Sequence, residues 1–128
     1  MKEYVVDKTI FVMGSEPSPE LTVDMVEKAI SDIRTESELA SLFAIVENKA
    51  WWIEDEEYDF AEGTVEHRQA VEKTELWFAL ADKLRKRIFC ILQSEGVEIP
   101  STGQIAVLDP FMKRNGYKNA QGWWVKND

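Results

Sequence analysis

A long apolar seam in the second half of the chain constrains the fold more than any other feature of the sequence. Its positions recur in steps of four and three without a break: Ala70, Thr74, Trp77, Ala81, Leu84, Ile88 and Ile91. This spacing predicts a helix that begins at Thr64, runs to Gly96 and is about 45 Å long at about 1.5 Å per residue. Additional apolar residues on both flanks favour a central place for this helix, with Trp77 in the middle of the core.

Two further helices are predicted before this seam. The first begins at the helix-start signature Ser18-Pro19-Glu20 and runs to about Arg34. The second is capped by Thr35 or Ser37, because either side-chain oxygen can accept a hydrogen bond from a first-turn amide, and it ends at Gly63. Its apolar face consists of Leu39, Leu42, Phe43, Val46, Ala50, Ile53 and Phe60.

The two ends of the chain favour β structure. Residues 3–13 are β-branched and aromatic, which predicts one or two short strands. Asp109-Pro110 predicts the start of a brief helix that ends at Gly116, and residues 117–125 predict a hairpin with its tip at 118–122. We therefore expect one domain, residues 1–128, of the α+β class and mainly α. Its three-helix core surrounds the long helix, and a small β element comes from the N-terminal segment and the C-terminal hairpin.

Composition indicates a globular chain that needs no disulfides. The 128 residues are 45% hydrophobic and include one cysteine, Cys90, which the flanking apolar residues predict to be a buried thiol. The N-terminus has no signal-peptide pattern, and no apolar run approaches the roughly 20 residues that span a bilayer. We expect a cytoplasmic protein without a membrane partner.

Charge is distributed unevenly along the chain, whose net charge is −9. Residues 16–66 carry fifteen Asp and Glu residues against three Lys and Arg, a balance of −12, whereas residues 67–128 carry a balance of +3. Such polarity bears on partners and association rather than on the fold. If the second and third helices pack antiparallel, the acidic residues could face a basic cluster on the third, made of Lys83, Arg85, Lys86 and Arg87.

Six carboxylates fall within residues 54–62, which we call the acidic run, beside Trp51, Trp52, Tyr58 and Phe60. The acidic run can imitate a phosphate backbone and occupy the basic channel of a nucleic-acid enzyme. Alternatively, it is only the solvated end of a helix. The candidate partner-binding residues in the acidic run are Glu54, Asp55, Glu56, Glu57 and Asp59.

The C-terminal segment has the order of a winged-helix fragment, a helix followed by a short helix and a hairpin. Its basic residues Lys113, Arg114, Lys118 and Lys126 could meet phosphates. Alternatively, the hairpin tryptophans close the core, which is the interpretation we favour because the chain is acidic.

Adjacent strand residues point to opposite faces, so Trp123 and Trp124 cannot both enter the core from one face. We expect Trp124 to be buried. We expect Trp123 to lie near the surface with Tyr117, beside Lys118 and Arg114. Arg114, Tyr117 and Trp123 therefore complete the candidate partner-binding residues.

The residues required for several common catalytic and metal sites are missing from the sequence. The single histidine, His67, is too few for the usual zinc and di-iron sites, and neither a Gly-rich phosphate loop nor a Gly-x-Ser-x-Gly motif occurs. The pairs Glu54/Glu57 and Glu72/Glu75 have the spacing used by helical magnesium-dependent nucleotide pyrophosphohydrolases, but charged helices often produce this spacing by chance. We expect no catalytic residue, metal or cofactor.

The string EGVEIPSTGQIAVLDPFMKRNGYKNAQGWWV resembles the ending of short proteins carried in prophages and mobile elements of Firmicutes. The resemblance covers about residues 84–125, and its distinctive elements are Ile-Pro, Pro-Phe-Met, Arg-Asn-Gly-Tyr and Gly-Trp-Trp. It implies a phage-linked accessory role and transfers no catalytic residue.

The sequence therefore favours a non-enzymatic protein-binding module, a phage-borne acidic inhibitor of a host nucleic-acid-handling or defence enzyme. Its expected partner is a host protein with a basic surface. A small winged-helix-like nucleic-acid-binding protein is the second hypothesis. A magnesium-dependent nucleotide pyrophosphohydrolase is the third.

Overall fold

The computed structural model describes residues 20–127. The strands predicted within residues 3–13 and the helix start predicted at Ser18 lie outside the described residues. The elements are α2 (Val23–Asp32), α3 (Glu36–Glu56), the 3-10 turn η1 (Glu57–Asp59), α4 (Val65–Ser94), α5 (Ile105–Arg114), β1 (Tyr117–Ala120) and β2 (Trp123–Lys126). The described chain is mainly helical with one small antiparallel hairpin, which confirms the predicted α+β, mainly α class.

A threonine side chain caps the N-terminus of each of the helices α2, α3 and α4. The hydroxyl oxygens of Thr22, Thr35 and Thr64 each accept a hydrogen bond from the amide three residues later, at 3.1–3.2 Å. These bonds satisfy amides that have no partner within the helix. Thr35 was one of the two caps predicted for its helix, and Thr64 was predicted to begin the next helix. Helix α2 begins at Val23, so the described residues 20–22, which the prediction placed inside a helix, lie before it.

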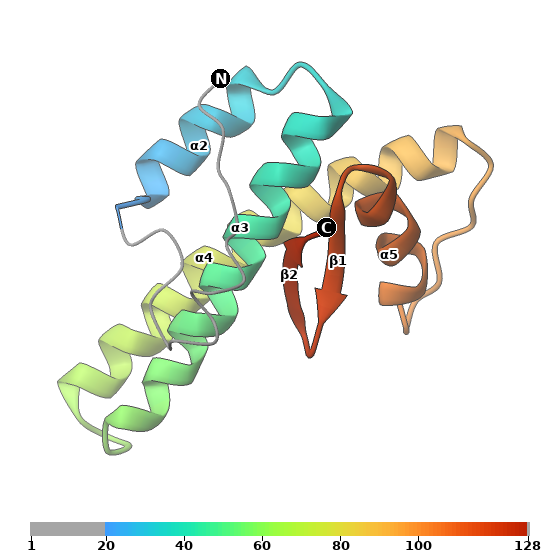
Figure 1. Cartoon of the computed structure of the whole chain (residues 1–128). Coiled ribbons are helices and arrows are strands. Elements are labelled where there is room, and N and C mark those ends of the chain that lie inside the picture. Colours follow the sequence, from blue (N-terminus) through green and yellow to red (C-terminus); the bar gives the residue numbers. More distant parts are fainter. Residues whose placement is uncertain (1–19, 128) are drawn as a thin grey trace.

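The two longest helices, α3 and α4, run antiparallel and pack along each other (Figure 1). The predicted seam of α4 faces α3, and Trp77, which is 3% exposed, lies in the core as predicted. At the end of the seam Leu92 is buried and Ile91 only half-buried. The α3 helix stops at Glu56, before the predicted end at Gly63, because the chain tightens into one 3-10 turn.

The central helix is α3, which corrects the prediction that the seam-bearing helix occupies the centre. Every residue from Leu39 to Ala50 is buried, because α2, α4 and the hairpin all pack against α3. On α4 several residues outside the seam stay open to solvent; Leu76 is 55% exposed and Cys90 is exposed. The prediction of a buried Cys90 thiol was wrong, since no described element covers that flank.

Polar side chains inside α3 join it to its neighbours. The Lys49 ammonium donates to the carbonyl oxygen of Leu21 (2.8 Å) and lies 4.9 Å from the Trp77 ring centroid. The Ser41 hydroxyl accepts from the Tyr117 hydroxyl (2.9 Å). Within the described residues, no buried side-chain nitrogen or oxygen lacks a hydrogen-bond partner. Each buried polar group thus avoids the cost of an unmade hydrogen bond.

The hairpin is held on α3 by Asn48, whose side chain is fully buried. The Trp124 amide donates to Asn48 Oδ1 (2.9 Å), and Asn48 Nδ2 donates to the Trp124 carbonyl oxygen (2.7 Å). Trp124 pairs with Asn119 across the ladder at a position where its own N–H and C=O point away from β1. The Asn48 amide therefore satisfies the outer edge of β2 as a neighbouring strand would.

The turn of the hairpin is shorter than predicted. Gln121 and Gly122 form it, both with positive φ (54° and 91°), while residues 118–120 belong to β1. Two positive φ values in a two-residue loop match the twist of the flanking strands. The Asn119 side-chain oxygen accepts from the Gly122 amide (3.1 Å) and supports the turn.

The last helix, α5, begins at Ile105 rather than at the predicted Asp109-Pro110. The amides of residues 106–108 bond the carbonyls of Gly103 and Gln104, so the predicted apolar run forms the first turn. This longer helix brings Leu108, Phe111 and Met112 into the core.

We predict that Trp77→Ala lowers the free energy of unfolding by about 3–5 kcal/mol, because it empties a buried aromatic site between α3 and α4. The neighbouring Leu76→Ala change removes a largely exposed side chain and should cost less than about 1 kcal/mol. Urea unfolding of both variants measures the difference. Equal losses would contradict the packing of α4.

We predict that Asn48→Asp destabilises the fold by about 3 kcal/mol or more at neutral pH, because a buried carboxylate oxygen would replace the donor that faces the Trp124 carbonyl. Burial should raise the pKa of this introduced carboxyl. Its penalty should therefore be full above the folded-state pKa and fall as pH drops below it, when the protonated group can donate again.

The matched control is Asn119→Asp, which keeps an oxygen acceptor for the Gly122 amide at an exposed position. Urea unfolding at neutral and mildly acidic pH gives both free-energy differences. The same loss for the two variants, or a loss at Asn48 that is independent of pH, would refute the role given to this amide.

Candidate functional site

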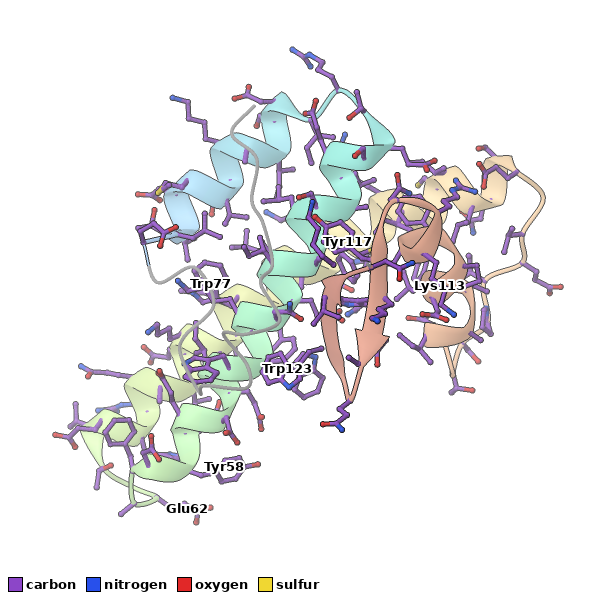
Figure 2. All side chains as sticks on the ribbon, viewed as in Figure 1. Tyr58, Glu62, Trp77, Lys113, Tyr117 and Trp123 are labelled. Carbon is purple, nitrogen blue, oxygen red and sulfur yellow. The ribbon has the colours of Figure 1, made fainter. Side chains whose placement is uncertain are left out.

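A cleft of about 550 Å³ lies between α3, the hairpin and the start of α5. In Figure 2, Trp123 lies between the hairpin and α3. The residues that line the cleft are Glu47, Trp51, Glu54 and Asp55 from α3, Ile105 from α5, and Asn119, Gln121, Gly122 and Trp123 from the hairpin. This volume falls in the range of ordinary ligand clefts, about 300–1,000 Å³.

The α3 wall of the cleft follows from helical periodicity. Glu47, Trp51, Glu54 and Asp55 are separated by four, three and one residues, so they share one face of the helix. Ile53 on another face is fully buried, whereas Trp51 is 47% exposed. One helix thus packs against the core with one face and lines an acidic, aromatic cleft with another.

The deepest carboxylate of the wall, Glu47, is fixed by two donors. Its Oε1 accepts from Trp124 Nε1 (2.9 Å), and its Oε2 accepts from the Arg85 guanidinium (2.6 Å). The Glu47 side chain is largely buried, and its charge is compensated by Arg85. Arg85 belongs to the basic cluster that could have faced the acidic run; it contacts Glu47 and Asp82 instead.

Two other side chains on this wall are also oriented. The Tyr58 hydroxyl donates to Glu54 Oε1 (3.2 Å), and this hydrogen bond raises the pKa of Tyr58. The Trp51 ring meets the Phe78 ring edge-on, with ring centroids 5.0 Å apart. A carboxylate and an indole are therefore held in place at the mouth of the cleft, and less side-chain freedom is lost when a ligand binds.

The acidic run does not act as one surface. Its residues Glu54 and Asp55 line the cleft, whereas Glu56 and Asp59 lie with Asp55 and Trp52 around a smaller hollow of about 200 Å³. Glu56 is 4.0 Å from the Lys73 ammonium, and Glu57 begins the 3-10 turn η1. The tyrosine of this turn, Tyr58, projects from the end of the helix pair in Figure 2.

Arg114, predicted to contact a partner, is engaged within the fold. Its guanidinium donates to both carboxylate oxygens of Glu36 (2.6 and 2.9 Å) and of Glu95 (2.9 and 3.0 Å), which joins α5 to the start of α3 and the end of α4. This hydrogen bonding lowers the pKa of Glu36. The stabilisation is therefore present above the ordinary pKa of a glutamate and is lost as pH falls through the lowered value.

Tyr117, predicted to lie near the surface with Trp123, is 4% exposed and belongs to the core. The register pairs Tyr117 with Lys126 and Ala120 with Trp123, so Tyr117 shares a face with Trp124 rather than with Trp123. The prediction failed because the tip was taken to be five residues long. Trp124 is fully buried, as predicted, and Trp123 is half-buried at the cleft.

The winged-helix hypothesis receives little support from this arrangement. The tip of the hairpin borders Glu54 and Asp55, whose charges repel phosphates. Of the basic residues counted for this hypothesis, Lys113 pairs with Asp109 (3.0 Å) and Arg114 with Glu36 and Glu95.

The third hypothesis, a magnesium-dependent nucleotide pyrophosphohydrolase, requires several carboxylates that converge on one metal ion. Among residues 20–127, no group of three or more His, Cys, Asp and Glu side chains has the arrangement of a metal site. Glu72 and Glu75 are exposed on α4, where they do not line the cleft.

Over residues 20–127, no helix has both the length and the apolar character that crossing a membrane requires.

Several cleft residues were not predicted as site residues. Trp51 and Glu47 could have been found from their spacing with Glu54 and Asp55 along one helical face. Ile105 and Asn119 reach the cleft only through tertiary packing, so no local sequence signal identifies them.

Comparison of the chain with protein-family models, curated proteins and solved structures finds no match. The site must therefore be interpreted from its own geometry and charge.

We predict that Trp124→Ala lowers the free energy of unfolding by about 3–5 kcal/mol, because Trp124 fills the space between the hairpin and α3. Trp123→Ala should cost clearly less, since its ring is only half-buried at the cleft. Thermal unfolding of the two variants measures this difference directly. A larger loss for Trp123→Ala would show that the two faces of the hairpin are assigned wrongly.

Proposed function

We propose that the chain is a non-enzymatic protein-binding module that docks a basic partner at the cleft between α3 and the hairpin. The observation that carries the proposal is the meeting of Glu54 and Asp55 with Trp51 and Trp123 at one concave surface. Carboxylates provide charge-assisted hydrogen bonds to cations, and indole faces attract cations through their quadrupole. The partner that fits best presents Lys or Arg.

Long-range electrostatics support the same kind of partner. The segment 16–66, which contains α2 and α3, carries the −12 balance, and α3 provides the acidic wall of the cleft. A one-signed field around a concave surface accelerates encounter with an oppositely charged protein. Both the contacts available in the cleft and the long-range electrostatic attraction toward it therefore favour a basic partner.

We further propose that the partner is a nucleic-acid-handling or defence enzyme of the host, which the chain inhibits as a phage-borne protein in the cytoplasm. Two arguments support this step. The C-terminal segment resembles proteins of prophages and mobile elements. Enzymes that handle nucleic acids carry basic channels for phosphates, and an acidic protein can compete for such a channel.

The test uses two double substitutions that remove the same charge. Glu54→Gln with Asp55→Asn neutralises the cleft, and Glu27→Gln with Asp32→Asn neutralises two exposed carboxylates on α2. We predict that the first pair weakens binding to a basic partner purified from the host by at least about 10-fold, as loss of central interface contacts does. The second pair should change affinity only a few-fold.

Isothermal titration at physiological salt gives the affinities, and circular dichroism checks that both variants fold. Equal weakening by the two pairs would show that only overall charge matters. An undiminished affinity of the cleft variant would exclude the cleft as the docking site.

A further inference from the structure

We propose that the cleft binds an arginine side chain of the partner between the carboxylates of Glu54 and Asp55 and the partly exposed ring of Trp51. This inference rests on the proposed function and makes it more specific. It assigns the ligand chemistry of the cleft as a guanidinium, in preference to an ammonium.

The shape of the walls favours a planar cation. The Trp51 and Phe78 rings are nearly perpendicular, with an interplanar angle of 85°, and Trp51 stays 47% exposed and lines the cleft. A guanidinium stacks on an indole face and still directs its N–H donors sideways to carboxylates. An ammonium is a compact, strongly hydrated charge and uses such a flat surface less well.

The carboxylates offer the acceptors that such a fork requires. Glu54 and Asp55 lie in the last turn of α3 and both line the cleft, so each can offer a carboxylate to a ligand bound there. The Tyr58 hydroxyl holds one oxygen of Glu54. Bidentate pairing of Arg with carboxylates is stronger and more directional than pairing with Lys.

The cleft also has a surface for the arginine stem. Ile105, at the start of α5, is 48% exposed and lines the same cleft as the α3 residues. An extended arginine buries its methylene groups against such an apolar surface while its charged end reaches the carboxylates. An exposed isoleucine beside an acidic wall is thereby matched to an amphipathic side chain.

The fold itself uses the same chemistry at two other places. The Arg114 guanidinium binds Glu36 and Glu95 and lies 5.0 Å from the Phe111 ring centroid. The Arg85 guanidinium binds Glu47 and lies 5.8 Å from the Phe43 ring centroid. Carboxylate and aromatic groups placed around a guanidinium are therefore compatible with stable packing in this chain. In the cleft, the chain supplies the carboxylates and the aromatic ring, and the partner would supply the guanidinium.

The experiment compares two blocked peptides of equal length and charge, one of alternating Arg and Gly and one of alternating Lys and Gly. We expect the full chain to bind the arginine peptide about 5-fold more tightly or better, which corresponds to one additional cation–π contact. Trp51→Leu should reduce the affinity for the arginine peptide to that for the lysine peptide. The Glu54→Gln, Asp55→Asn variant should weaken binding of both peptides, and the Glu27→Gln, Asp32→Asn variant should change neither appreciably.

Titration followed by NMR, with thermal unfolding of each variant, gives affinities for chains shown to be folded. Equal affinity for the two peptides, lost in the cleft double variant, would overturn the arginine assignment and leave the basic-partner function standing. Arginine binding that survives both Trp51→Leu and the cleft double variant would place the ligand elsewhere and overturn the inference. If neither peptide binds more tightly to the parent chain than to the cleft double variant, the inference and the docking function both fail.

Discussion

The position of the hairpin edge on the central helix depends on one buried amide. Asn48, in the middle of α3, forms two hydrogen bonds with the backbone of Trp124 and thereby fixes the outer edge of β2. With that edge fixed, the Trp124 indole reaches Glu47 and Trp123 reaches the cleft. A two-stranded hairpin alone is at best marginally stable in water, so the hairpin keeps its shape by docking on the helix. The second wall of the cleft is therefore a consequence of helix packing rather than of strand pairing.

The same requirement explains why the central helix of this fold is rich in polar residues. A helix covered on all sides usually consists of apolar residues, yet α3 buries Glu47, Asn48 and Lys49 in succession. Glu47 and Asn48 contact the hairpin, and Lys49 contacts Leu21 ahead of α2. Successive helical residues point about 100° apart, so three consecutive polar residues can serve different neighbours. The core thus gains specific attachments to the elements on both sides of α3, at a desolvation cost that the hydrogen bonds offset.

Local sequence patterns predicted the elements better than their arrangement. The seam through Trp77 and the helix starts at Thr35 and Thr64 are local signals, and the structure confirms them. The central position of α3 was missed because its charged residues resemble a solvent-exposed face until their partners are known. Tyr117 was misplaced because a two-residue turn at positive φ, with Gln rather than Asn or Gly first, carries a weak signal. The sequence predicted the acidic and aromatic residues of the cleft only separately, since the α3 residues lie at least 50 positions before the other residues that line it.

The position of the cleft carboxylates connects stability with the proposed function. Glu54 and Asp55 lie in the last turn of α3, which contains no basic residue, and the negative end of the helix dipole disfavours carboxylates there. This unfavourable interaction is worth only a few tenths of a kcal/mol. The burial of apolar side chains elsewhere on α3 stabilises the helix by more than that. A cation bound in the cleft would interact favourably with both carboxylates and with the helix end. Since any ligand that binds only the folded state stabilises it, a basic partner would stabilise the end of α3 that its own charge makes least favourable. The carboxylates that cost stability in the free chain are thus the groups from which the proposed basic partner would gain most.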